Sequence, residues 1–526
     1  MNKIKKGVIA IALVGAMALA GVSALNSKNV KANEVQKTSG SEDERRTNLS
    51  VDANGTLQVN RNKLGDEPMG DEGTWTIFIY MCGSDLETNY QAASNDIKEM
   101  ISGAESDKVN IVIETGGASA WNKPCIDADR IGRYIIKDNK MELIESHPDA
   151  NMGDPSTLKS FLKWGIKKYP AEKMGVVLWN HGGGTLGGVC CDEKNNMDSL
   201  SLVEMEKALY DTSKNMTDKF EFIGFDACLM ASIETANVLA PYANYMVASE
   251  QVESGEGWYY KPFIDALVAN PNMDGKEIGK VIVDGFMEFA NQYEDELQFS
   301  TLALIDLSKV DDVLVAFNDV AKQIDEQTSD GDKINSYMEQ AGYSLSEGCG
   351  DYEFGLVDLS DYMDKIASLV SGTDKVKEAV KNMVVYEKHG TQAPNANGIT
   401  FYFPTMEAGM VYMNLMRNVE VSPYFMNFLD KAEGYYMFTY DEAIRQGYLD
   451  ENYNPIEGKD MNEFVPGPYT LQNYVDNNWE SNKYYFDKDF EFMEYDFISM
   501  EEYEELKEFP YYAEATFDEN WFALYN

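Results

Sequence analysis

The chain has 526 residues, more than a single hydrophobic core usually serves, so we expect two or three structural units. Its 89 Asp and Glu against 44 Lys and Arg give a formal net charge of −45. Such an acidic surface repels phosphate backbones and anionic lipids. Composition therefore argues against nucleic-acid binding and polybasic membrane binding, and it favours cationic partners such as basic peptides.

The N-terminus is typical of an export signal. Three lysines within the first six residues precede an apolar stretch over 7–20, and small residues follow it. We expect a signal peptide at 1–32, cleaved after Ala24 or Ala32. The apolar stretch is too short for a membrane anchor, so the sequence predicts a secreted chain with no membrane span after cleavage. The six cysteines are too scattered for a small disulfide-stapled scaffold, which favours a working thiol among them.

The first ordered elements are expected after a polar segment. Residues 33–73 are rich in Asn, Gly, Ser and charge, a composition typical of a flexible leader or pro-segment. The β-branched and aromatic run at 74–81 then predicts a buried strand. Ser84 with Glu87 three residues later is a capping-box pattern, which predicts a helix over 84–101.

Strand and helix patterns alternate along the next part of the chain. Buried strands are expected at 109–117, 174–180, 220–227 and 245–249, an edge hairpin at 132–138 and 141–146, and helices over 155–169, 202–210 and 229–239. This alternation predicts an α/β fold, with a mostly parallel central sheet covered by helices on both faces.

The second half, from about 261 to 429, continues with a helix over 310–324 and strands at 300–307 and 398–405. We place one α/β domain over 74–430. From 431 to 526 acidic residues alternate with Tyr, Phe and Trp, which defines an acidic, aromatic-rich C-terminal extension of unknown role.

Two buried strands end on reactive side chains. The run at 174–180 leads to His181 and the run at 220–227 leads to Cys228. Carboxyl ends of parallel strands open into the crevice where ligands bind, so neighbouring strands would bring imidazole and thiol together. Either residue alone is more often structural, but the pair is the equipment of nucleophilic catalysis.

The surroundings of the pair fit acyl transfer. Gly182 leaves the backbone beside His181 uncovered, and the helix expected directly after Cys228 would lower the pKa of the thiol. The amides of Gly182 and Cys228 could form an oxyanion hole, in which each donor is typically worth ~3 kcal/mol of barrier. The competing thiols rank below Cys228, because none shares its placement opposite a histidine: Cys82, Cys190 and Cys191.

The motifs WNHGGG, FDACLMASIE and SGEGWYY resemble the clostripain family of cysteine peptidases. The resemblance runs from about residue 74 to 429 and includes the SDLE and FYFP segments. It implies a caspase-like three-layer α/β/α sandwich, shared with legumain, gingipains and separase. It also implies a His181–Cys228 dyad that hydrolyses peptide bonds after Arg or Lys, with no third catalytic member required.

The resemblance also implies a basic-residue pocket and self-processing. A cationic side chain needs a carboxylate, for which Asp226 is the first candidate and Glu256 the second. The alternative for Asp226 is a helix N-cap or a structural hydrogen bond, and the alternative for Glu256 is a solvated loop residue. Family members are often zymogens cut between histidine and cysteine. The one basic residue in that loop is Lys194, so scission at Lys194–Asn195 is expected, with an ordinary exposed lysine as the alternative.

The sequence predicts no metal site, since its three histidines lie far apart and no zinc spacing occurs. No cofactor is required for the expected chemistry. Relatives differ in calcium dependence and no calcium loop is recognisable, which leaves calcium open. Two other readings remain: a catalytically degenerate binding module of the same fold, or a transpeptidase.

Overall fold

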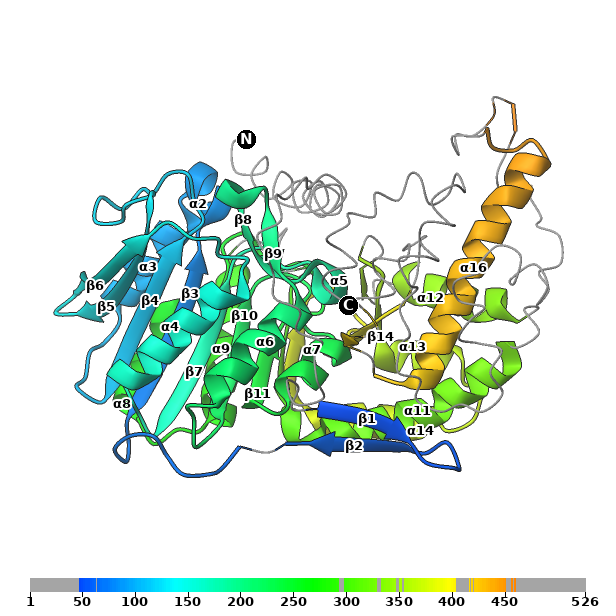
Figure 1. Ribbon diagram of the computed structural model, residues 1–526, viewed down its shortest axis with the longest axis horizontal. Helices are drawn as coiled ribbons and strands as arrows, with labels where there is room; N and C mark the ends of the chain where they lie inside the picture. Colours follow the sequence, from blue (N-terminus) through cyan, green and yellow to red (C-terminus); the bar gives the residue numbers. More distant parts are fainter. Residues whose placement is uncertain are drawn as a thin grey trace, which may run out of the picture.

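The computed structural model describes residues 47–459, apart from 63, 293–297, 329–332, 347–349, 352–353, 404–415, 417, 420, 451–455, 457 and part of the side chains of the last helix. The expected signal peptide, most of the expected C-terminal extension and Cys349 lie outside the described residues. A central sheet with helices on both sides forms one part of the molecule, and a second, largely helical part lies beside it (Figure 1).

The central sheet has nine strands in the order β15-β12-β11-β10-β7-β3-β4-β5-β6. The strands are β3 (Trp75–Cys82), β4 (Val109–Gly116), β5 (Arg130–Lys137), β6 (Lys140–Pro148), β7 (Lys173–Trp179), β10 (Phe220–Asp226), β11 (Ala243–Ala248), β12 (Thr301–Asp306) and β15 (Val384–His389). Its five middle strands are parallel, while β12 and β15 on one side and β5 and β6 on the other pair antiparallel. The expected parallel sheet with an edge hairpin is therefore confirmed, within a sheet that is mixed overall.

The middle strands are buried because helices cover both faces. One face packs against α4 (Pro155–Lys168), α6 (Leu202–Ser213) and α7 (Ile233–Leu239). The opposite face packs against α3 (Ala92–Ser102), α8 (Tyr260–Ala269) and α9 (Gly275–Ala290). Two apolar layers on a shared sheet make the expected three-layer sandwich.

The second part extends the first core layer. It contains α11 (Val310–Gln327), α12 (Ile334–Ser346), α13 (Leu359–Lys365), α14 (Thr373–Met383), α16 (Pro423–Arg445) and a small sheet of β13 (Gly350–Asp351), β14 (Leu356–Asp358) and β16 (Thr400–Tyr402). The strand expected at 398–405 thus belongs to this small sheet. The boundary expected at 430/431 falls inside α16, so no break in structure separates the two segments there.

The segment expected to be a flexible leader is partly folded. Its strands β1 (Thr47–Val51) and β2 (Leu57–Arg61) form an antiparallel hairpin beside α7 and α11 (Figure 1). Arg61 donates to the carboxylate of Asp311 at 2.6 Å and to the backbone and side-chain oxygens of Asn237. These contacts reach residues about 180 to 250 positions away, which composition alone could not anticipate.

The helix expected over 84–101 is two helices. Gln91 has a φ of 63°, a left-handed conformation that ends α2 (Ser84–Tyr90) and precedes α3. Ser84 makes no capping bond, so the expected capping box is wrong. Glu87 instead accepts from the backbone and hydroxyl of Ser94 and from the backbone of Asn122, because the turn between the helices brings those donors to it.

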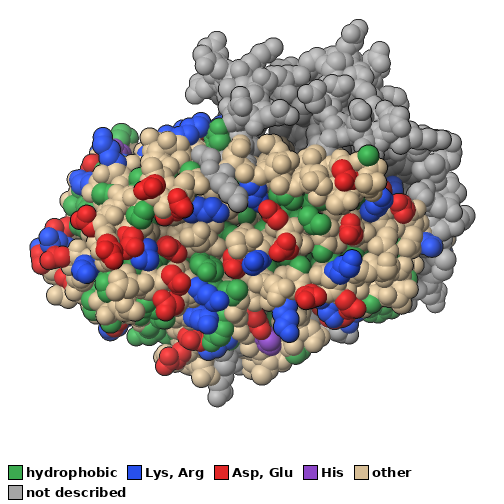
Figure 2. Space-filling model, turned by 90° about the horizontal axis from the view of Figure 1, so that it is seen from below, with side chains coloured by type: hydrophobic (Ala, Val, Ile, Leu, Met, Phe, Trp, Pro, Cys, Tyr) green, Lys and Arg blue, Asp and Glu red, His purple; other side chains and the backbone are tan. Residues whose placement is uncertain are grey.

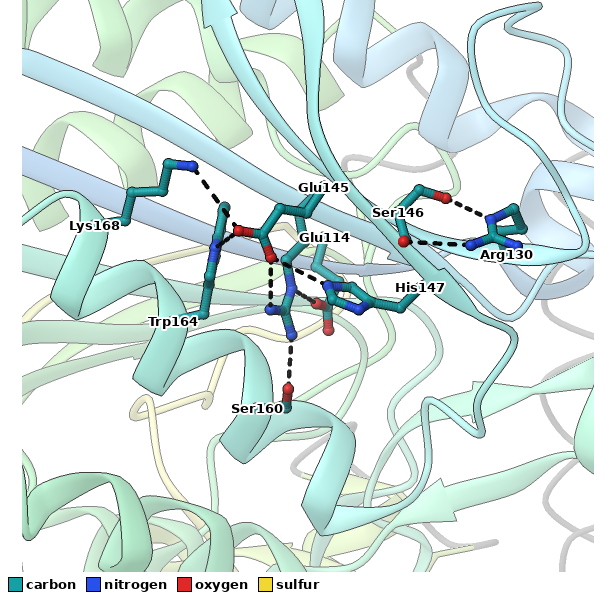
Figure 3. Close-up of polar contacts among 9 residues, drawn as sticks. Glu114, Arg130, Glu145, Ser146, His147, Ser160, Trp164 and Lys168 are labelled. Carbon is teal, nitrogen blue, oxygen red and sulfur yellow. Dashed lines mark hydrogen bonds and ion pairs between the residues drawn. The ribbon is translucent and has the colours of Figure 1, made fainter.

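A buried ion pair stabilises the β4–β5–β6 edge (Figure 3). The Arg133 guanidinium donates to Glu114 at 2.6 Å and to Ser160 at 2.8 Å. It also lies over the Trp164 ring, 4.9 Å from the centroid. Burial raises the pKa of Glu114 to about 7 against the opposing effect of Arg133. Glu114 lies on β4, which β3 separates from β7, the strand that leads to His181.

Candidate active site

The register of two neighbouring strands brings the expected dyad residues together. β7 and β10 pair in parallel, and Trp179 with Asp226 is their last pair. His181 and Cys228 each follow two residues later, so they leave the same edge of the sheet side by side. A Cβ on Gly182 would lie 2.0 Å from the carbonyl oxygen of Cys228, which shows how closely the two segments approach. The predicted adjacency of the two strands is confirmed.

His181 is held by a carboxylate. The side chain is 8% exposed, and its Nε2 lies 2.9 Å from Oδ1 of Asp85. Burial favours the neutral form of Asp85, but hydrogen bonds from His181 and Ser84 and the charge of His181 keep the pKa of this carboxyl below its usual value. An ionised Asp85 accepts a hydrogen bond from the Nε2–H group, which leaves Nδ1 as the ring nitrogen available for chemistry.

Asp85 is a site residue that the sequence reasoning did not identify. It lies just beyond the carboxyl end of β3, the strand that pairs with β7, and Ser84 before it has a φ of 48°. A strained backbone at a strand end is common at functional sites. The signal in the sequence was an acidic residue placed after a buried strand, the same placement that singled out His181 and Cys228.

Cys228 lies in a turn, not at a helix start. The expected helix over 229–239 begins only at Ile233, capped by the hydroxyl of Ser232, so the predicted helix directly after the thiol is wrong. Leu229 has a φ of 68°. Its amide donates to the carbonyl of Gln251 at 3.0 Å, which ties the turn to the segment after β11. These contacts, not helix propensity, determine the local conformation.

The thiol is surrounded by acidic groups. The backbone amide of Glu253 donates to Sγ of Cys228 at 3.2 Å. Burial and then the charge of Glu253 raise the pKa of Cys228 to about 12, with smaller effects of Asp351 and Asp226. The lowered pKa expected for this thiol from a following helix is therefore wrong.

Two backbone amides at this edge of the sheet have no hydrogen-bond partner among the described residues. Within the described part of the chain, neither the Gly182 nor the Cys228 amide donates to another group. Flanking bonds hold the Gly182 segment in place, from Gly183 to the carbonyl of Gly188 and from Cys190 to the carbonyl of His181. These free donors are the ones that the sequence suggested for an oxyanion hole.

The competing thiols lie on strands β3 and β8 (Val189–Asp192), whereas Cys228 lies in a turn. Cys82 is buried at the end of β3 and donates to the carbonyl of Cys191 at 3.3 Å. Cys190 and Cys191 belong to β8. Burial raises the pKa of all three thiols, for Cys191 to about 12. Cys82, Cys125, Cys190, Cys191 and Cys228 are all free of disulfides.

The two expected pocket acids come from one neighbourhood. Asp226 ends β10 and accepts from the backbone of Trp258 at 3.0 Å and from the hydroxyl of Tyr260 at 2.8 Å. Burial raises its pKa to about 7. Glu256 is exposed on the loop between β11 and α8, and its charge acts on Asp96 and Glu99 of α3.

The loop between His181 and Cys228 contains a hairpin that hydrogen bonds and an ion pair hold in place. It contains α5 (Gly184–Gly187), strands β8 and β9 (Asp198–Leu200), and a short 3₁₀ turn η2 (Glu193–Asn195). Asp192 accepts from the amides of Lys194 and Asn195. The Lys194 ammonium lies 2.7 Å from Asp149 and 2.5 Å from the carbonyl of Ala128. Lys194 is therefore partly buried in contacts away from Cys228.

The remaining histidines make local ion pairs. His147 contacts Glu145 (Figure 3), and His389 contacts Glu387. Among the described residues, no group of three His, Cys, Asp or Glu side chains is arranged to hold a metal ion. On the face shown in Figure 2, Lys and Arg side chains are interspersed with Asp and Glu. No helix in the described ranges is both long and apolar enough to cross a bilayer.

Comparisons with known proteins agree with this architecture. The model of the clostripain family matches residues 79–457. Clostripain of Hathewaya histolytica is 25% identical over 459 residues, covering 74% of this chain and 82% of that protein. A secreted C11 cysteine protease of Bacteroides thetaiotaomicron, solved with an irreversible peptide inhibitor, superposes with a TM-score of 0.50 at 19% identity. It covers 67% of this chain and 98% of its own.

A second structure from the same organism, called iotapain, superposes with a TM-score of 0.51 at 19% identity, over 69% of this chain and 99% of its own. These two likenesses support the fold, and the family model spans most of the chain, including both strands that carry the expected dyad. The chain therefore belongs to the clostripain family of cysteine proteases.

Proposed function

We propose that this protein is a secreted endopeptidase that hydrolyses peptide bonds after Arg or Lys through Cys228 and His181. The observation that carries the proposal is the parallel register of β7 and β10, which brings both residues two positions beyond the same last pair. Clostripain of Hathewaya histolytica, the curated relative, supports the choice of a peptide substrate.

The proposed reaction has two stages. The Cys228 sulfur attacks the peptide carbonyl, its proton passes to His181, and the tetrahedral oxyanion is stabilised by the amides of Gly182 and Cys228. His181 then protonates the leaving amine, which yields a thioester. Water attacks the thioester with His181 as base and releases the acid product. Asp85 holds the imidazole through Nε2 during both stages.

The substrate preference is proposed from charge. Asp226 ends β10 two residues before Cys228, and Glu256 lies on the loop between β11 and α8. The charges of both act on Asp96 and Glu99 of α3, so the four acids share one neighbourhood. Among the described residues, no Lys or Arg forms an ion pair with Asp96, Glu99 or Asp226. A cationic substrate side chain would supply the missing charge.

We also propose self-processing at Lys194–Asn195. The Lys194 side chain is only 18% exposed, so it must leave Asp149 before this bond can enter an active site. A Cys228→Ala chain on its own should stay intact, whereas added active enzyme should cut it in trans. A Lys194→Gln chain should remain uncut under both conditions. Cleavage elsewhere would contradict this site.

Reporter peptides that end in Arg, Lys or the neutral isostere citrulline test the role of Cys228 as nucleophile and the preference for basic residues. Cys228→Ala should abolish hydrolysis, while Cys125→Ala, which removes an exposed free thiol, should retain it. Each assay is run with calcium and with a chelator. Activity that survives in Cys228→Ala, or equal rates on Arg and citrulline reporters, would overturn the proposal. Secretion is tested by comparing the amount of the protein in the culture supernatant with the amount in the cell fraction.

A further inference from the structure

Glu253 is joined to the nucleophile through its own backbone. Its amide donates to Sγ of Cys228 at 3.2 Å, and its negative charge is the largest charge effect on that thiol. The residue lies on the segment after β11, which also ties down the turn at Leu229. Its position is therefore determined by the same contacts that position Cys228.

The Glu253 carboxylate has no partner in the described part of the chain. Both of its oxygens are buried from solvent and accept no hydrogen bond. The indole Nε1 of Trp258 is near enough to lower the pKa of Glu253, yet the two groups do not form a hydrogen bond of normal geometry, and this donor is also unpaired. Burial of an unpaired carboxylate is costly unless a ligand supplies the partner.

Asp226, the acid favoured by its position in the sequence, differs from Glu253 because both of its oxygens accept hydrogen bonds. One oxygen accepts from the backbone of Trp258 and the other from the hydroxyl of Tyr260. A Cβ on Gly257 would lie 2.9 Å from Oδ1, so the loop is folded closely around this carboxylate. Asp226 is occupied in holding the loop that presents Glu253.

The neighbourhood lacks a counter-charge of its own. The charge of Asp226 acts on Glu253, Asp96 and Glu99. Across the described residues, no Lys or Arg pairs with Glu253, as none pairs with the other three. A cation from outside the chain is the group that would satisfy these acids together.

We infer that Glu253 is the specificity-determining carboxylate, which pairs directly with the cationic side chain of the residue before the scissile bond. Asp226 acts as a positioning residue for the Glu253 loop. This inference rests on the proposed preference for Arg and Lys. It assigns the direct ion pair to the acid whose amide contacts Cys228 and whose two carboxylate oxygens accept no hydrogen bond from any described residue.

The pairing has a consequence for Glu253 itself. Burial and then the charge of Asp226 raise the pKa of Glu253 well above its ordinary value, so the unpaired acid is held towards its neutral form. A guanidinium or ammonium beside it would favour the ionised form. Binding of the correct side chain and ionisation of Glu253 are therefore linked.

The test compares Glu253→Gln with wild type on matched reporters ending in Arg or citrulline. The variant keeps the size of the side chain and removes the charge. We expect kcat/KM on the Arg reporter to fall about 30-fold or more, mainly through KM. The rate on the citrulline reporter should fall no more than about threefold. Glu288→Gln, an exposed change on α9, is the matched control and should leave both rates unchanged.

The outcomes separate the two proposals. A wild-type enzyme without preference for Arg over citrulline overturns the proposed function and this inference together. A wild-type preference that Glu253→Gln retains overturns only the inference. Equal losses on both reporters show a structural role for Glu253 and overturn it as well. Glu253→Asp provides a second measurement. The shorter acid should lower kcat/KM unequally on the Lys and Arg reporters and leave kcat/KM on the citrulline reporter unchanged.

Discussion

Nε2 of His181 lies 2.9 Å from Oδ1 of Asp85, and both side chains are about nine-tenths buried. The two residues come from neighbouring strands, since β3 pairs directly with β7. A buried carboxylate at this distance determines which ring nitrogen carries the proton and which faces the substrate. The active site therefore contains an orienting acid in addition to the proposed dyad.

Asp85→Asn should lower kcat about tenfold or more and leave KM within twofold of wild type, because the amide keeps the shape but removes the charge that orients His181. Asp85→Ala should lower kcat further. Steady-state kinetics on an Arg reporter measure both. Asp107→Asn, an exposed change, serves as the control. A rise in KM with unchanged kcat would show that Asp85 acts on substrate binding instead.

Gly182→Ala should abolish activity without unfolding the protein. Its Cβ would lie 2.0 Å from the carbonyl oxygen of Cys228, so the backbone at the oxyanion site must shift. Gly187→Ala is the matched control, because its Cβ would meet only the edge of Phe354 at 3.8 Å. Rates and thermal melting are measured for both. A fully active Gly182→Ala enzyme would contradict the proposed oxyanion site.

The preference for Arg over citrulline should increase between pH 6 and pH 8. Burial raises the pKa of Asp226 and of Glu99 to about 7, so these acids lose their protons across this range. Ionised acids attract the guanidinium, and KM for the Arg reporter should fall. The ratio of kcat/KM values for the two reporters cancels effects on catalysis itself. A ratio that is constant from pH 6 to pH 8 would argue against a titrating pocket.

Arg133→Ala should destabilise the fold by about 3 kcal/mol at pH 7, because it leaves Glu114 buried without its partner. The raised pKa of about 7 means that Glu114 costs stability as pH rises from its ordinary 4.5 through 7. The loss should therefore be smaller at pH 5, where Glu114 is protonated.

Urea unfolding at the two pH values tests this difference. The double variant Glu114→Gln with Arg133→Met should recover much of the loss, since neither charge then remains buried. An Arg133→Ala protein that is equally destabilised at both pH values would show that lost packing on Trp164 dominates.

Local pattern was sufficient for the sheet and for the dyad residues. Unbroken apolar runs predicted the middle strands, because strands buried on both faces carry few polar residues. The position of His181 and Cys228 after two such runs predicted their shared edge. Local pattern failed at Cys228 itself. The sequence pattern predicted a helix there, but hydrogen bonds to Gln251 and Glu253 hold the segment in a turn.

The sequence by itself determined the layers, the strand adjacency and the placement of His181 and Cys228 at one edge of the sheet, since these depend on periodicity and spacing within short segments. Only the tertiary structure decided which acids lie against His181 and Cys228. Asp85 reaches His181 across 96 positions of the chain, and Asp226 is bound by Tyr260 while Glu253 stays unpaired. In a chain with 89 acids, burial and hydrogen-bond partners distinguish those few, and both are properties of the folded chain.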